Sequence, residues 1–117
     1  SQLTAFDLGP DGSLTNRRVW ASLGDHTPDG ICLDQEGAIW VSSFGAGEFL
    51  RVTEGGKIVE TIAADDGKRA VACNLGGADG RTLFALTFEG EIEDISAGGK
   101  KARIEVCTVD VPGAGSP

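Results

Sequence analysis

One acidic side chain is the leading candidate for chemistry, because the residues on either side of it control its backbone. Asp29 lies between Pro28, which restricts the dihedral φ, and Gly30, which permits close backbone approach. A carboxylate held in this way can bind a hard divalent cation, which prefers oxygen ligands, or can act as a general base. On the tripeptide alone, the capping of a turn is the simpler interpretation of an Asp that precedes Gly.

The other reactive residue types complete no familiar catalytic group. The single histidine, His26, precedes Asp29 and could line the same site, although an exposed loop position is the simpler interpretation. One histidine and no Gly-x-Ser-x-Gly motif exclude the usual nucleophilic triads. Cys32, Cys73 and Cys107 are odd in number, far apart and each within an apolar run. We interpret them as free core thiols of a reducing compartment.

Composition limits the classes of partner. The 117 residues carry a formal net charge of −8, which argues against nucleic-acid binding because phosphate contacts need a basic face. The charge suits a metal site or a solvated acidic surface. No apolar run reaches the length that crosses a membrane, and the first residues show no signal peptide. We therefore expect a soluble, cytoplasmic protein with no nucleic-acid or membrane partner.

A repeat organises the short apolar runs that alternate with Gly-rich turns. Gly12 recurs as Gly56, 44 residues later, and the run 39–44 recurs at the same offset as 83–88. A period of this length with four strands in each unit is typical of β-propeller blades. We therefore predict an all-β fold with strands over the following runs: 3–8, 14–23, 30–33, 38–44, 49–53, 57–63, 71–75, 82–88, 91–95 and 102–109.

On this frame, residues 1–117 are the C-terminal portion of a propeller with about two and a half blades. Residues 3–23 form the outer half of one blade, and 30–63 and 71–109 form two complete blades. Such an array cannot close a ring, so the chain is a fragment, pairs with a missing piece or closes the ring by assembly. A flat β-sandwich is the rival fold, but it would not require the repeated turns.

The predicted blades place Asp29 in a functional position. Innermost strands of a propeller converge on its axis, and Asp29 comes directly before the innermost strand 30–33. Its carboxylate should therefore face one mouth of the central channel. Trp20 and Trp40 are interpreted as core between blades, and Asp34 as part of a turn between strands.

The segment from Pro28 to Val41, Pro-Asp-Gly-Ile-Cys-Leu-Asp-Gln-Glu-Gly-Ala-Ile-Trp-Val, resembles a signature of the gluconolactonase and regucalcin (senescence marker protein) family. Four other parts of the chain are similar to further segments of that family, in the same order. They are Phe6-Asp7-Leu8 with Leu14-Thr15-Asn16-Arg17-Arg18-Val19, Ala72 to Gly77, Arg81 to Phe84, and Val109 to Gly115. The resemblance implies a six-bladed β-propeller of which the first blades are absent from this chain.

The resemblance also implies hydrolysis of sugar lactones with one divalent metal, calcium or zinc, on the propeller axis. Of the family's metal ligands only one has a counterpart, Asp29, which is then both the metal ligand and the candidate catalytic base. Arg69 and Cys73 lie where the family's next blade faces the pocket, which makes them weaker candidates for substrate contact. The resemblance implies that the other ligands, a Glu and an Asn, belong to the missing blades.

Three hypotheses follow from these observations. In the first, the complete propeller is a lactonase to which this chain contributes Asp29. In the second, the chain is a catalytically incomplete β module that self-associates or pairs with the N-terminal blades. In the third, the same scaffold performs other chemistry, such as phosphotriester hydrolysis or luciferin regeneration, because fold does not determine function.

Overall fold

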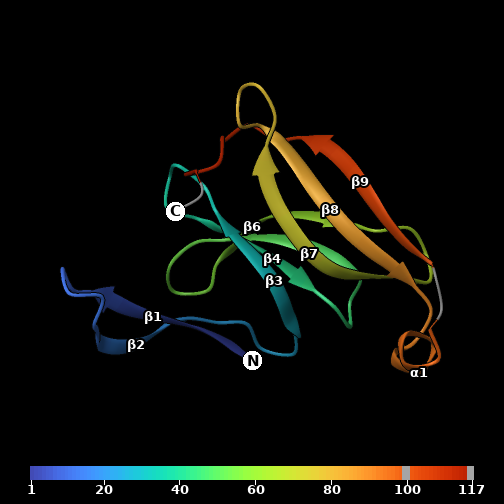
Figure 1. The fold of residues 1–117 in the computed structure, drawn as a ribbon, viewed down its shortest axis with the longest axis horizontal. Helices are drawn as coiled ribbons and strands as arrows, with labels where there is room; N and C mark the ends of the chain where they lie inside the picture. Colours follow the sequence, from blue (N-terminus) through green and yellow to red (C-terminus); the bar gives the residue numbers. More distant parts are fainter. Residues whose placement is uncertain (99–100, 116–117) are drawn as a thin grey trace.

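The structure, a computed structural model, describes residues 1–98 and 101–115. Within them the chain forms nine β-strands and one short helix (Figure 1). The elements are β1 (Gln2–Leu8), β2 (Leu14–Ser22), β3 (Pro28–Leu33), β4 (Ile39–Ser43), β5 (Glu48–Val52), β6 (Ile58–Ala63), β7 (Lys68–Gly76), β8 (Thr82–Glu89), α1 (Ile92–Ser96) and β9 (Ala102–Thr108). No helix among the described residues has the length and apolar character needed to cross a membrane.

The strands form three antiparallel sheets in which each strand pairs with its neighbour in sequence. The sheets are β1-β2, β3-β4-β5-β6 and β7-β8-β9. Nine of the ten predicted runs are strands, so the all-β prediction is confirmed. The repeat is also visible in three dimensions, because the 44-residue offset carries β2 onto β6 and β4 onto β8. Gly12 and Gly56, related by that offset, both have positive φ, at 84° and 96°.

The predicted strand over residues 91–95 is wrong, because this segment begins the helix α1. The amide of Glu91 donates to the Asp94 carboxylate at 2.7 Å, and the Asp94 amide donates to the Glu91 carbonyl at 3.0 Å. These contacts satisfy the first backbone groups of a helix. The third sheet therefore has three strands among the described residues, where four were expected.

The middle sheet is buried on both faces. Trp40 packs with Phe49 and Leu83 in a cluster shared with the third sheet, while Val41 and Leu50 pack in a second cluster shared with the first sheet. Side chains alternate between the faces of a strand, so adjacent residues of β4 and β5 serve two different cores. Trp40 is fully buried, as expected for a residue between blades, and Trp20 packs partly buried against the second cluster.

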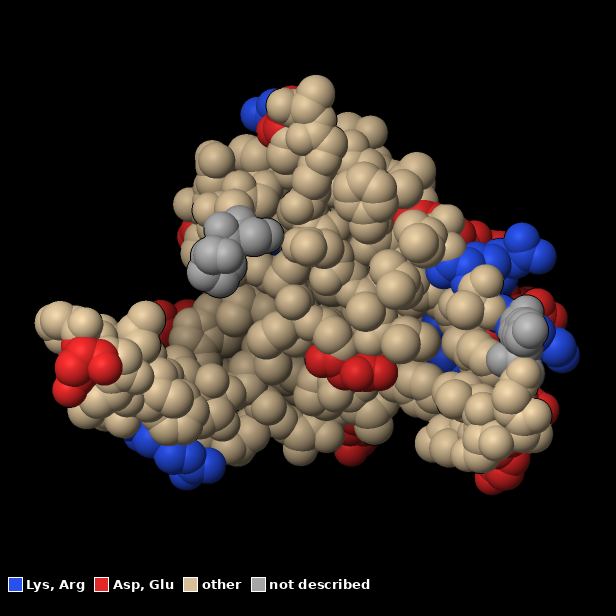
Figure 2. All heavy atoms as spheres, viewed as in Figure 1, with Lys and Arg blue, Asp and Glu red and all other residues tan. Residues whose placement is uncertain are grey.

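Apolar side chains are exposed at both ends of the stack of sheets. Leu8 and Leu14 of the first sheet are 75% and 63% exposed, and Ile104 and Val106 of β9 are 69% and 62% exposed. Figure 2 shows one broad face that is largely uncharged, with an acidic group near its middle and other charged side chains toward its edges. Exposed apolar faces at the two ends of an array indicate that further protein surface belongs against them.

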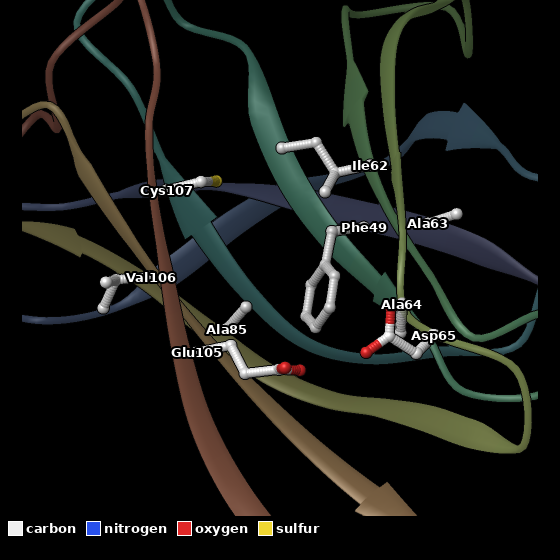
Figure 3. Close-up of a pocket in the computed structure, with 9 residues that line it drawn as sticks. All are labelled: Phe49, Ile62, Ala63, Ala64, Asp65, Ala85, Glu105, Val106 and Cys107. Atoms are coloured by element: carbon white, nitrogen blue, oxygen red, sulfur yellow. The ribbon is translucent and has the colours of Figure 1, made fainter.

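The second and third sheets form a wedge that is narrow between their first strands. A Cβ atom placed on Gly30 of β3 would lie 2.6 Å from the Cα atom of Ala72 of β7, so the two backbones leave no room for a side chain there. At the outer strands the sheets separate around a cavity of about 170 Å³ (Figure 3). Ile62 of β6 and Cys107 of β9 lie on its opposite walls. This wedge is the geometry of neighbouring blades around an axis.

A buried ion pair closes the turn between β3 and β4. The Asp34 side chain is fully buried and accepts from the Arg51 Nε atom at 2.7 Å. Its other oxygen accepts from the amides of Glu36 and Ala38 at 2.9 Å and 3.1 Å. Asp34 is therefore a structural residue, as the sequence indicated. The pair joins the turn to β5, because Arg51 reaches it from that strand.

Replacing Gly30 with Ala tests the wedge. We expect Gly30→Ala to lower the free energy of unfolding by about 1–3 kcal/mol, because the added methyl group meets backbone atoms of β7. Gly76→Ala is the matched control, since its Cβ would meet only the ring of Phe84 at 3.2 Å. Urea denaturation followed by circular dichroism measures both changes. Equal losses in the two variants would contradict the close contact of β3 with β7.

Replacing Asp34 with Ala tests the buried ion pair. We expect Asp34→Ala to lower the free energy of unfolding by about 3–5 kcal/mol, because the Arg51 guanidinium would lose its fully buried carboxylate partner, with Glu36 and Glu60 remaining beside it. The amides of Glu36 and Ala38 would also lose their acceptor. Asp66, an exposed residue in the turn before β7, provides the control variant Asp66→Ala. Thermal denaturation is the measurement. A loss no greater than that of the control would show that Glu36 and Glu60 are enough to stabilise the Arg51 guanidinium.

Candidate metal centre

Asp29 lies in a β-bulge at the start of β3. Pro28 pairs with Ser43 and Ile31 with Val41, so three steps along β3 match two steps along β4. A bulge redirects the side chains of the extra residue, and bulges are common beside active sites. Asp29 is exposed, and among the described residues no hydrogen-bond or ion-pair partner contacts its carboxylate. The turn-capping role considered from the sequence is therefore not the one that it has.

The loop before Asp29 is held by the turn between β4 and β5. The Thr27 carbonyl accepts from the Phe44 amide at 2.9 Å, and the Thr27 Oγ1 atom accepts from the Gly45 amide at 2.7 Å. The His26 Nδ1 atom shares a hydrogen bond of 3.0 Å with the hydroxyl of Ser43, which is fully buried. His26 is thus a half-buried anchor of this loop, which corrects the interpretation of an exposed loop histidine.

At this end of the sheets, each loop contacts the next loop along the chain. The amide of Ala64, after β6, donates to the Gly47 carbonyl at 2.8 Å. The amide of Gly90, after β8, donates to the Gly67 carbonyl at 3.3 Å. Together with the contacts of Thr27, these bonds form a continuous rim around one end of the second and third sheets. Asp29 lies beside this rim, two residues after Thr27, where β3 begins.

Arg69 joins two parts of the rim. Its Nη1 atom donates to the Gly45 carbonyl at 2.8 Å, and its Nη2 atom donates to the Glu91 carboxylate at 2.6 Å. The sequence singled out Arg69 as a candidate for substrate contact, but the structure shows both ends of the guanidinium bound by protein. The partner Glu91 was not found from the sequence, because its segment was predicted as a strand.

Cys73 is enclosed between the second and third sheets. Its side chain is 6% exposed, and its thiol lies 3.6 Å from the Trp40 carbonyl oxygen and 3.7 Å from that of Gly30. The sequence-based suggestion that Cys73 contacts a substrate is therefore wrong in this structure, since its sulfur faces protein. The residue belongs to the packing between β3 and β7.

Asp29 fits a divalent cation as one ligand of several. Its carboxylate oxygens are hard donors, which calcium prefers, and they are accessible. Within residues 1–98 and 101–115, no group of three or more His, Cys, Asp or Glu side chains is arranged to hold a metal ion. Calcium takes six to eight oxygen ligands, so a centre at Asp29 would need further donors, such as carboxylates from additional blades, carbonyl oxygens or water.

Comparison with known sequences identifies the family. Residues 1–89 match the family described as the SMP-30/Gluconolactonase/LRE-like region. The regucalcin of Danio rerio is 36% identical over 84 residues, which cover 68% of this chain and 28% of that protein. The regucalcin of Sus scrofa is 31% identical over 105 residues, which cover 81% of this chain and 35% of that protein. The chain thus spans about a third of the length of these relatives.

Comparison with solved structures agrees on the fold. A luciferin-regenerating enzyme matches with a TM-score of 0.78 and 20% identity, over 96% of this chain and 39% of the enzyme. A calcium-binding protein, regucalcin from Agrobacterium tumefaciens, matches with a TM-score of 0.72 and 21% identity, over 99% of this chain and 41% of that protein. The chain therefore belongs to the SMP-30/gluconolactonase/LRE-like family and forms part of its β-propeller.

Proposed function

We propose that this chain contributes part of a divalent-metal-dependent lactonase that hydrolyses a sugar lactone once the propeller is complete. In this proposal Asp29 is the metal ligand that the chain supplies, and calcium or zinc is the metal. The family description includes gluconolactonase, and one structural relative is described as a calcium-binding protein. Both descriptions support the proposal, and relatives of the family are about two and a half times as long as this chain.

One observation carries the proposal more than any other. Asp29 is an exposed carboxylate without a protein partner, and it stands in a bulge of an inner strand whose preceding loop is anchored. Asp11 and Asp79, by contrast, accept hydrogen bonds from backbone amides two residues later, as turn residues do. An anchored carboxylate with free lone pairs is arranged to bind a ligand.

The chain's own residues would act by positioning. Bound at this site, a divalent cation would supply Lewis-acid polarisation of the lactone carbonyl group. The Asp29 carboxylate would accept the proton of the attacking water as a general base. Thr27 would fix the start of β3 through its hydrogen bonds to the β4–β5 turn. The ion pair between Arg69 and Glu91 would fix the adjacent part of the rim.

A second function is supported by the exposed ends of the stack. The apolar side chains on β1, β2 and β9 would be covered if the chain associated with copies of itself or with the missing N-terminal blades. As the described residues offer one suitable carboxylate and no metal cluster, the isolated chain would then be catalytically inactive. This alternative concerns the chain alone and makes no claim about the completed propeller.

Substitution of Asp29 tests the catalytic proposal. In a propeller completed by the upstream blades, we expect Asp29→Asn to lower kcat/KM for gluconolactone by on the order of a hundredfold or more, because a charged ligand and base is lost. Calcium affinity measured by titration calorimetry should fall in the same variant. Lactone hydrolysis is followed by proton release.

Asp25→Asn is the matched control, since Asp25 is another exposed carboxylate four residues earlier in the same loop. It should leave both the kinetics and the calcium affinity close to those of the parent protein. Equal activity in the Asp29 and Asp25 variants, or activity that survives removal of all divalent metal, would exclude the proposed role of Asp29.

The mass of the isolated chain in solution tests the second function. We expect a mass by light scattering above the 12.1 kDa of one chain, because exposed apolar faces associate. Ile104→Lys should shift the mass toward the monomer, whereas Thr61→Lys, which adds the same charge at an exposed polar position of β6, should not. A parent chain that stays monomeric and folded at high concentration would contradict the alternative.

A further inference from the structure

Two of the three cysteines lie in contact across the boundary between the second and third sheets. The Cys32 Sγ atom, on β3, is 3.9 Å from the Cys73 Sγ atom, on β7, although 41 positions separate the two residues. The structure contains both as free thiols. Sequence spacing alone gave no reason to pair them, because the contact depends on how one sheet stacks on the next.

The close approach of the two backbones brings these sulfurs together. Gly30 and Cys32 lie on the face of β3 that is turned to β7, and Gly30 leaves no space for a side chain against Ala72. Cys73 follows Ala72 directly. A disulfide has a sulfur–sulfur distance of about 2.05 Å, so bond formation requires the sulfurs to approach by about 2 Å. Rotation about the Cα–Cβ bonds of two side chains supplies movements of this size.

The two thiols differ in accessibility and in acidity. Cys32 lines a cavity of about 260 Å³ with Ile31, Asn74 and Leu75, so its sulfur can be reached, whereas Cys73 is buried. The Cys32 thiol donates to the Cys73 sulfur. This hydrogen bond raises the pKa of Cys32, which burial raises further, and it lowers the pKa of Cys73. Cys73 is thus the member of the pair that more readily becomes a thiolate.

We propose that Cys32 and Cys73 form a reversible disulfide that joins the two sheets when the chain meets a small-molecule disulfide such as oxidised glutathione. Cys32 reacts first because its sulfur is the accessible one: it loses its proton, attacks the small disulfide and releases one small thiolate, which leaves a mixed disulfide on Cys32. The Cys73 thiolate then attacks the Cys32 sulfur and releases the second small thiolate. The two cysteine protons pass to the released thiolates, so two cysteines are oxidised and one disulfide is reduced.

Cys107 takes no part in this proposal. It lies on β9 beside a different cavity, lined by Ile62 and Phe49, and burial raises the pKa of its thiol (Figure 3). Among the described residues, no other sulfur contacts it. The contact between Cys32 and Cys73 therefore selects one of the three pairings that three cysteines allow.

The bond would fasten the strand that carries Asp29 to the neighbouring blade. It would close a loop of 41 residues between β3 and β7, which removes conformational freedom from the unfolded chain. In the chain-entropy description, this lowers the unfolding equilibrium constant by on the order of a hundredfold or more. The inference stands independently of the lactonase proposal, because it requires only the stacking of two sheets.

The test uses the folded 117-residue chain equilibrated with mixtures of reduced and oxidised glutathione, then quenched with N-ethylmaleimide. We expect a species that is lighter than the reduced chain by two hydrogen atoms and carries one maleimide, on Cys107. Trypsin separates the three cysteines onto peptides 19–51, 70–81 and 104–117, so the linked pair 19–51 with 70–81 identifies the bond. The same linkage should persist in Cys107→Ala and be absent in Cys32→Ala.

A thermodynamic cycle distinguishes a bond built into the fold from a chance oxidation. The oxidation equilibrium constant should be on the order of a hundredfold larger in the folded chain than in guanidinium chloride above the unfolding midpoint. The unfolding equilibrium constants of the oxidised and reduced chains should differ by the same factor. Equal oxidation in the folded and unfolded states, or glutathione found mainly on Cys107, would overturn the proposal.

Discussion

The contact between β3 and β7 is the constraint on which the rest of the structure depends. Gly30 has no room for a Cβ atom against Ala72, so the first strands of two sheets meet at backbone distance while their outer strands separate around a cavity. Sheets that meet at one edge and diverge at the other must be arranged around an axis. The same contact fixes the position of Asp29, which directly precedes Gly30. It also brings the sulfur atoms of Cys32 and Cys73 within 3.9 Å of each other. Packing, candidate site and thiol pair thus follow from a single close approach.

The acidic residues of the second sheet illustrate how similar side chains serve different purposes. Asp34 is fully buried, and both of its oxygens are occupied by Arg51 and by two backbone amides. A carboxylate in this position is costly without partners, and it gains them from its own turn and from β5. Asp29, five residues earlier, is exposed and has no partner among the described residues. The contrast arises because Asp34 lies in a buried turn directly after β3, whereas Asp29 lies at the exposed start of that strand.

Much of this architecture could be predicted because the repeat acts on local structure. The 44-residue offset relates Gly12 to Gly56, and each turn requires the positive φ that glycine allows. The strand prediction for residues 91–95 was wrong. The charges and isoleucines of this segment suit a short strand, but the Asp94 carboxylate accepts a hydrogen bond from the Glu91 amide and a helix begins there. The roles of His26 and Arg69 could not be predicted, because their partners, Ser43 and Gly45, lie in other strands or loops. The blade boundaries and the catalytic role of Asp29 stay predictions.

The division of a propeller into similar blades explains why so much of the fold, and so little of the site, is present here. Each sheet finds its core against its immediate neighbours, so the middle sheet is buried on both faces with only one sheet on each side. The proposed site on the axis is different, because its ligands would have to come from several blades. A chain that spans about a third of its relatives can therefore fold locally and still hold just one carboxylate of the proposed metal centre. The exposed apolar ends and the unpartnered Asp29 have the same physical origin, which is a ring that these residues do not close.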